Sequence, residues 1–138
     1  TWWRRVERHG EMAVKGSEYL SNHPKVAHVG FPGLSSSPYQ DLAEECLPKG
    51  AGSIFSFELK GGYEAAMKLI DRLKIFSDLA NVGDSKSLVV HPSSTTHQQL
   101  NEEAQRSAGI TPGQIRLSVG LENIDDLLAD LEQALDQI

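Results

Sequence analysis

One arginine has unusual surroundings in the sequence. Arg116 lies in the run Gln-Ile-Arg-Leu-Ser-Val-Gly, whose other residues favour a β-strand with an apolar side. A guanidinium is costly to bury there unless it meets an anion. Its planar fork suits a carboxylate, which accepts two parallel hydrogen bonds. The segment therefore predicts a carboxylate-binding position at the edge of a sheet. The alternative is an internal ion pair with one of the nineteen acidic residues.

Two histidines and several hydroxyls form a second polar group in the sequence. His91 and His97 flank the run Pro-Ser-Ser-Thr-Thr, and histidines near hydroxyls occur in metal sites and beside nucleophiles. No third metal ligand follows at a recognisable spacing, so no metal site is predicted. The glycines at 50–52 and 61–62 lack the spacing of phosphate-binding loops and are predicted to form turns.

Helices and strands alternate in the elements that must position these side chains. Apolar residues at three- and four-residue spacing predict helices, and alternating or β-branched runs predict strands. Ser37 and Asn123 are the expected N-caps of the second and the last helix. The stretch after Ser77, up to Asp84, is expected to pass close to a site rather than to pair in a sheet. The predicted helices cover residues 4–21, 39–46, 63–73, 98–108 and 124–134, and the predicted strands cover residues 25–30, 53–59, 87–90 and 114–119.

Length and composition describe one domain that can bury a core, since the chain has 138 residues of which 39% are hydrophobic. The alternation of elements fits an α/β sheet covered by helices. A net charge of −6 argues against a broad nucleic-acid surface, and no apolar run is long enough to cross a membrane. No signal peptide is visible. The single Cys46 cannot form an internal disulfide, which fits the reducing cytoplasm, and it is expected to be buried and inert, with a reactive thiol as the alternative. The start at Thr1 suggests a longer or a processed gene product.

Many ordered segments of the chain resemble one known family. The chain is similar to the C-terminal domain of the pyridoxal-phosphate (PLP) enzymes of cysteine and methionine metabolism, and most of all to the O-acetylhomoserine sulfhydrylases among them. The matching segments are Asn81–Asp84, Ser87–Pro92, Thr95–His97, Ala108–Ile110, Ile115–Gly120 and Ile124–Leu127, with Leu47–Gly52, Asn22–Val26 and Arg8-His9 before them.

The resemblance implies a particular architecture. It implies a small, largely antiparallel four-stranded sheet covered by helices, as in the C-terminal domain of fold-type I PLP-dependent transferases. Residues 1–138 would be this substrate-side domain, and the larger PLP-binding domain would lie outside the chain. The family's cofactor lysine sits in a Ser-x-Thr-Lys motif, which no lysine of this chain matches. We therefore expect PLP in the full-length enzyme, no cofactor bound to this chain alone, and no activity from the isolated chain.

The resemblance also implies roles for individual residues. Arg116 would bind the substrate α-carboxylate, and Asn81 aligns with a position near the amino-acid end of the substrate. Relatives that make or break cystathionine often carry Ser-Leu-Gly-Gly where this chain has Asn-Val-Gly-Asp, which favours the sulfhydrylase branch. Thr96 and Ser87 are further substrate-binding candidates, with Thr96 in a loop at the active-site entrance. For Ser87 the alternative is a strand residue bonded to backbone. No catalytic residue is expected in this chain.

The implied activity of the full-length protein is a γ-replacement. Acetate of O-acetyl-L-homoserine would be replaced by sulfide or a thiol, giving homocysteine or a homologue in methionine biosynthesis. The resemblance further implies a homotetramer, and we expect a cytoplasmic protein with no nucleic-acid or membrane partner. Two alternatives stay open. One is a sister activity, as in a cystathionine synthase or a γ-lyase, and the other is a non-catalytic module for amino-acid binding or assembly.

Overall fold

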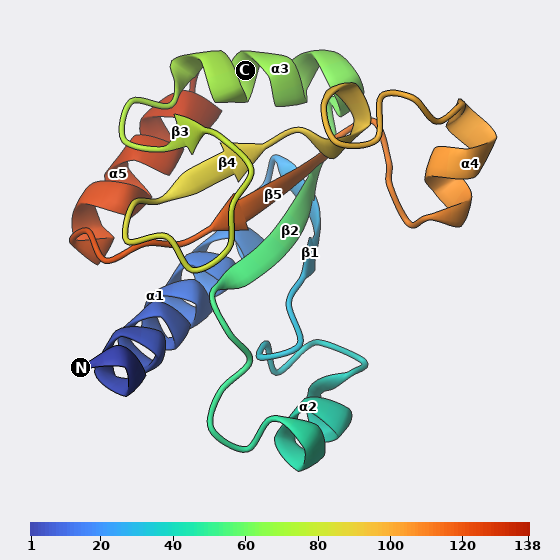
Figure 1. Ribbon diagram of the computed structural model, residues 1–138. Helices are drawn as coiled ribbons and strands as arrows, with labels where there is room; N and C mark the ends of the chain where they lie inside the picture. The colour runs from blue at the N-terminus through green and yellow to red at the C-terminus, as the bar shows by residue number, and fades with distance from the viewer.

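A five-stranded sheet forms the centre of the computed structural model, which describes residues 1–138 (Figure 1). Its order is β1-β2-β5-β4-β3. Every neighbouring pair is antiparallel except β3 and β4, which run parallel. The α/β class predicted from the alternation of elements and the largely antiparallel sheet implied by the resemblance are therefore confirmed. The strands are β1 (Val26–Gly30), β2 (Ile54–Leu59), β3 (Ser77–Asp78), β4 (Leu88–Val90) and β5 (Gln114–Ser118).

The fifth strand corrects the prediction of a four-stranded sheet. Ser77 and Asp78 pair with Leu88 and Val89, so part of the stretch expected to stay outside the sheet is its edge strand. The backbone N–H of Ser77 donates to the carbonyl oxygen of Ser87 at 3.1 Å. A strand of two residues is too short to show an alternating pattern in the sequence. Only its pairing with β4 identifies it as a strand.

Three helices cover one face of the sheet: α1 (Trp2–Ser21), α3 (Gly62–Arg72) and α5 (Ile124–Leu135) (Figure 1). Helix α1 contacts β1 and β2, α3 contacts β2 and β5, and α5 packs against both helices. The core between the two layers is formed mainly by Met12, Leu20, Phe55, Phe57, Leu69, Ile115, Leu117, Leu131 and Leu135. The helices α2 (Gln40–Cys46) and α4 (Glu102–Ser107) lie at the periphery, and the short 3-10 helix η1 (Pro92–Ser94) follows β4.

The alternation of side chains along the strands separates the two faces of the sheet. On β5, Ile115 and Leu117 are fully buried against the helices, whereas Gln114 and Arg116 are half-buried on the opposite face. Residues along β2 alternate in the same way. No long helix covers this second face, so polar side chains can lie there without meeting the apolar core.

Capping residues explain which of the predicted helix starts agree with the structure. Asn123 caps α5 as predicted, because its side-chain oxygen accepts from the N–H of Asp125 at 2.8 Å. The predicted cap of α2 is wrong: its N-cap position is Tyr39, whose N–H donates to the hydroxyl of Ser37 at 3.2 Å without a helical cap. Helix α4 begins at Glu102 rather than at residue 98, since Asn101 caps it there.

Two further observations concern the cysteine and the character of the helices. The thiol-bearing Cys46 is exposed at the end of α2, not buried as expected for inert packing. No helix of the structure has both the length and the apolar character needed to cross a bilayer.

Candidate functional site

Arg116 lies on the middle strand of the sheet, not at its edge as the sequence suggested. It pairs with Ser56 of β2 and with Val90 of β4, so a strand flanks it on each side. Strand propensity indicates that a segment joins a sheet but not which place it takes. The central position holds the backbone of Arg116 in two ladders and gives its side chain a well-defined origin on the uncovered face.

The guanidinium of Arg116 has few partners inside the chain. Its Nη2 donates to the carbonyl oxygen of Asn81 at 3.4 Å, and its Nε is buried with no partner. The one ion pair within the chain joins Arg8 and Glu11, so Arg116 meets no carboxylate of its own chain. The internal ion pair considered from the sequence is therefore not formed. A half-buried guanidinium without an anion has donors available for an external carboxylate.

A cleft of ≈ 270 Å³ surrounds this guanidinium. Residues of β1, β2 and β5 and of the loop that follows η1 line it. The Oγ1 of Thr96 and the Nδ1 of His97 lie 2.8 Å apart in this loop. The cleft thus brings the arginine, a hydroxyl, an imidazole and an amide together around a space for a small polar molecule. Its polar lining residues are Ser56, Thr96, His97, Gln114 and Arg116.

The loop that starts at Asn81 closes one side of Arg116 through its backbone. Only the carbonyl of Asn81 reaches the guanidinium, because its side chain is used within the loop. The side-chain oxygen of Asn81 accepts from the N–H of Val82 at 2.9 Å, and its amide donates to Asp84 at 3.2 Å. Asp84 in turn accepts from the N–H of Lys86 at 2.9 Å. The side chain of Asn81 therefore shapes the loop, and its predicted contact with substrate stays a prediction.

The pKa of Asp84 follows from these contacts. The hydrogen bond from the backbone N–H of Lys86 lowers the pKa most, and partial burial opposes it. The side chain of Asn81 and the positive charges of Lys86 and His9 lower the pKa further. Asp84 is thus held as a carboxylate within the loop.

Ser87 is fully buried and is not part of the cleft. Its hydroxyl donates to Oε2 of Glu122 at 2.7 Å and accepts from the N–H of Gly120 at 2.8 Å. Its own N–H donates to Oε1 of Glu122 at 2.8 Å. The hydroxyl proton is therefore already engaged, and the structure does not bring Ser87 to Arg116. Glu122 was not singled out in the sequence, where only its polar character after an apolar strand marks it.

His91 serves the loop rather than a metal. Its Nε2 lies 2.7 Å from the carbonyl oxygen of Pro112, and its Nδ1 lies 2.7 Å from the hydroxyl of Ser94. A carbonyl only accepts, so Nε2 is the donor in the contact with Pro112. The ring also meets Tyr63 edge-on at 5.0 Å. The structure holds no group of three His, Cys, Asp or Glu residues arranged for a metal ion.

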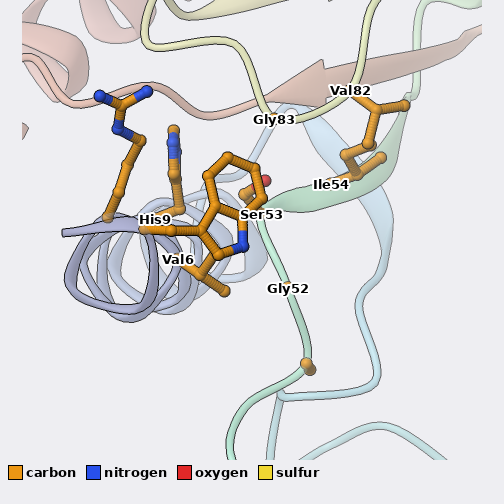
Figure 2. A pocket seen from close by; sticks show the side chains of 10 residues that line it. Val6, His9, Gly52, Ser53, Ile54, Val82 and Gly83 are labelled. Carbon is orange, nitrogen blue, oxygen red and sulfur yellow. The ribbon is translucent and has the colours of Figure 1, made fainter.

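A second, more apolar hollow of ≈ 420 Å³ is lined in part by Val82 and Gly83 of the loop that starts at Asn81. Figure 2 shows Val6 and His9 of α1 on one side of it and Val82 and Gly83 on the other. Nδ1 of His9 lies 2.6 Å from the carbonyl oxygen of Val119, while Nε2 is buried without a partner. Near this hollow, the side chains of Trp2 and Trp3 at the start of α1 are exposed. The loop 81–87 thus lines this hollow with Val82 and Gly83 and contacts the guanidinium of Arg116 through the carbonyl of Asn81.

Comparison with known proteins identifies the class. The solved structure assigned as an O-acetylhomoserine (thiol)-lyase from Campylobacter jejuni superposes with a TM-score of 0.91 at 46% identity, covering 96% of this chain and 32% of that chain. It carries an N'-pyridoxyl-lysine-5'-monophosphate. The fold is that of part of a fold-type I PLP-dependent enzyme.

Sequence relatives give the family. A family model described as Cys/Met metabolism PLP-dependent enzyme matches residues 1–136, and the chain belongs to this family. The O-acetyl-L-homoserine sulfhydrylase of Leptospira meyeri is 56% identical over 135 residues, which is 97% of this chain and 30% of the relative. The L-methionine gamma-lyase of Fusobacterium nucleatum subsp. polymorphum is 46% identical over 134 residues, 97% of this chain and 34% of the relative. The chain thus spans about a third of the length of these proteins.

The residues of this chain do not fit the covalent attachment of PLP. A lysine must form the Schiff base with the cofactor aldehyde. No lysine lines the cleft of Arg116 or the apolar hollow beside it. What this chain offers is the guanidinium of Arg116 with polar side chains around it, an arrangement that can accept a carboxylate.

Proposed function

We propose that this chain is the substrate-side, C-terminal part of a PLP-dependent O-acetylhomoserine sulfhydrylase. The observation that carries the proposal is the guanidinium of Arg116, which lies in a polar cleft without a carboxylate of its own chain. The likeness to the Leptospira meyeri sulfhydrylase supports the substrate class. The whole protein would be a cytoplasmic homotetramer about three times as long as this chain, with the cofactor lysine in the larger domain.

In this proposal, Arg116 holds the α-carboxylate of O-acetyl-L-homoserine by two parallel hydrogen bonds. Thr96 lies in the same cleft and offers a hydroxyl to the bound amino acid. PLP, held by the larger domain, supplies the electron sink that lets acetate be replaced by sulfide or a thiol. The contribution of this chain is orientation, because a fixed carboxylate limits the positions of the reacting carbon. The product would be homocysteine or a homologue.

Substitution of Arg116 tests this proposal in the full-length protein. We expect Arg116→Ala to raise the KM for O-acetyl-L-homoserine by about tenfold or more, equivalent to ~1.4 kcal/mol of lost binding. Arg116→Lys keeps the charge without the two-pronged geometry and should be intermediate. Arg106→Ala on α4 removes an exposed arginine and is the matched control. A change in KM below about twofold for Arg116→Ala would refute the assignment.

A sister activity is the second candidate, supported by the likeness to a methionine gamma-lyase. The run Asn-Val-Gly-Asp at 81–84 favours the sulfhydrylase. Parallel assays with sulfide, cysteine and water as the incoming partner separate the two, since a sulfhydrylase should prefer sulfide. A non-catalytic amino-acid-binding or assembly module is the third candidate. It predicts a natural protein with the mass of this chain, which an antibody blot of the source cell measures.

A further inference from the structure

We infer that Glu122 is a positioning residue for the carboxylate anchor. It fixes the end of the loop 81–87 against the turn after β5 and thereby sets the Asn81 carbonyl on Arg116. This inference rests on the proposed role of Arg116. Ser87, predicted from the resemblance to touch substrate, acts in this arrangement through Glu122 instead.

The contact between Glu122 and Ser87 has the geometry of a two-point clamp. The two carboxylate oxygens accept separately from the N–H and the hydroxyl of Ser87, at 2.8 and 2.7 Å. Both distances are short, as expected when the acceptor is charged. Ser87 is fully buried and Glu122 is half-buried, which limits the access of water to these bonds. The clamp therefore fixes the last residue of the loop firmly.

The turn around Gly120 reinforces this attachment. The N–H of Gly120 donates to the hydroxyl of Ser87, and the N–H of Leu121 donates to the carbonyl oxygen of Ser85, both at 2.8 Å. A Cβ at position 120 would lie 2.6 Å from the backbone carbon of Lys86 and 2.6 Å from Oε2 of Glu122. The loop therefore rests directly on the glycine backbone, with no side chain between them.

Hydrogen bonds within the loop connect its attached end at Ser87 to Asn81. Asp84 accepts from the N–H of Lys86 and from the side-chain amide of Asn81. By contrast, the bond between Asn81 and Arg116 is 3.4 Å long and thus weak. Such a bond does not hold an otherwise exposed loop in place. The shorter bonds at Glu122 must therefore supply the restraint that keeps the carbonyl beside the guanidinium.

Steady-state kinetics of the full-length protein test the inference. We expect Glu122→Gln to raise the KM for O-acetyl-L-homoserine by about three- to tenfold, with kcat changed less than about twofold. Glu132→Gln removes an exposed carboxylate from α5 and should leave both constants unchanged. In an Arg116→Ala background, Glu122→Gln should have almost no further effect on KM, because the anchor that it positions is gone.

Hydrogen exchange supplies a second readout that does not depend on activity. We expect Glu122→Gln to speed exchange at Leu121 and in residues 82–87, while the cores of α1 and α5 exchange as before. Unchanged exchange in the loop, or an unchanged KM while Arg116→Ala raises KM, overturns the positioning role alone. If Arg116→Ala itself leaves KM unchanged, the proposed function fails and the inference fails with it. A uniform rise in exchange over the whole chain marks Glu122 as merely structural and also overturns the inference.

Discussion

Arg116 has unfulfilled hydrogen-bonding capacity, and this defines its chemistry. Its Nε is buried without a partner, and an unsatisfied buried donor costs on the order of 1–3 kcal/mol. Its one bond to the carbonyl of Asn81 is long, so most of its donors are available. A carboxylate arriving in the cleft would satisfy two of these donors at once and recover that cost. Lys25 differs from Arg116 in this respect, because its ammonium already donates to the carbonyls of Leu135 and Ile138 at the end of α5.

Asp84 gives the loop beside Arg116 a dependence on pH. Its pKa is lowered, chiefly by the N–H of Lys86, so it lies below the ordinary value of about 3.9. The stabilisation by its bonds is complete above that ordinary value and is lost as the pH falls through the lower folded pKa. We expect the carboxyl carbon-13 shift of Asp84 to stay constant from neutral pH to about pH 5 and to titrate below about 3.9. A midpoint at or above the ordinary value would contradict this, and Asp84→Asn should abolish the acid response of the loop.

At the scale of elements, the turn after β5 connects the strand that carries Arg116 to the loop that faces it. The N–H of Val119 donates to the carbonyl oxygen of Ser53, and the carbonyl oxygen of Val119 accepts from His9 of α1. The next residue, Gly120, has its backbone in contact with the loop. The turn therefore joins β2, α1 and the loop, and a small shift of its backbone would move all three.

Gly120→Ala should destabilise the protein because the new methyl group meets backbone atoms of the loop that cannot rotate away. We expect a loss of about 1–3 kcal/mol in the free energy of unfolding, measured by urea denaturation. Gly10→Ala in α1 is the control, since its methyl group would approach nothing closer than 4.0 Å. It should stabilise the helix by about 0.5–1 kcal/mol. Equal effects of the two substitutions would show that the close contact at Gly120 is unimportant.

At the scale of the whole chain, the two faces of the sheet differ, because helices cover one of them and leave the other open. The three long helices bury the apolar side of the sheet, and Arg116 lies on the side that they leave open. Packing between helices is fixed by a buried carboxylate as well as by apolar contacts. Asp130 of α5 accepts from the backbone N–H groups of Lys74 and Ile75, at 2.9 and 2.8 Å, just beyond the end of α3. The helical layer therefore also determines where the chain enters β3.

Asp130→Ala tests how far this buried carboxylate holds the layer together. The substitution leaves two backbone N–H groups without their partner, and we expect a loss of about 2–4 kcal/mol in the free energy of unfolding. Asp136→Ala at the C-cap of α5 is the control, because that exposed carboxylate lies at the negative end of the helix dipole. It should be neutral or slightly stabilising. Denaturant midpoints of the two variants compare them directly, and a loss below ~0.5 kcal/mol for Asp130→Ala would contradict the expectation.

The sequence by itself determined the local features of this protein. Spacing of apolar residues identified the long helices and four of the strands, and Asn123 marked the start of α5, because these features depend on residues close together in the chain. The unusual residue Arg116 was visible for the same reason, since its apolar neighbours are adjacent in sequence. The start of the predicted helix 98–108 was placed too early, because residues 98–101 continue the polar pattern of the helix. The side chain of Asn101 caps the helix, which begins at Glu102.

Only the tertiary structure decided which distant residues these local features contact. The central place of β5, the short strand β3 and the absence of an ion pair at Arg116 depend on contacts between distant segments. The clamp between Ser87 and Glu122 joins residues 35 positions apart. No periodicity encodes such a pair, because which segments become neighbours is set by the packing of the whole core. The sequence thus supplied the arginine, and the fold decided that its donors remain free.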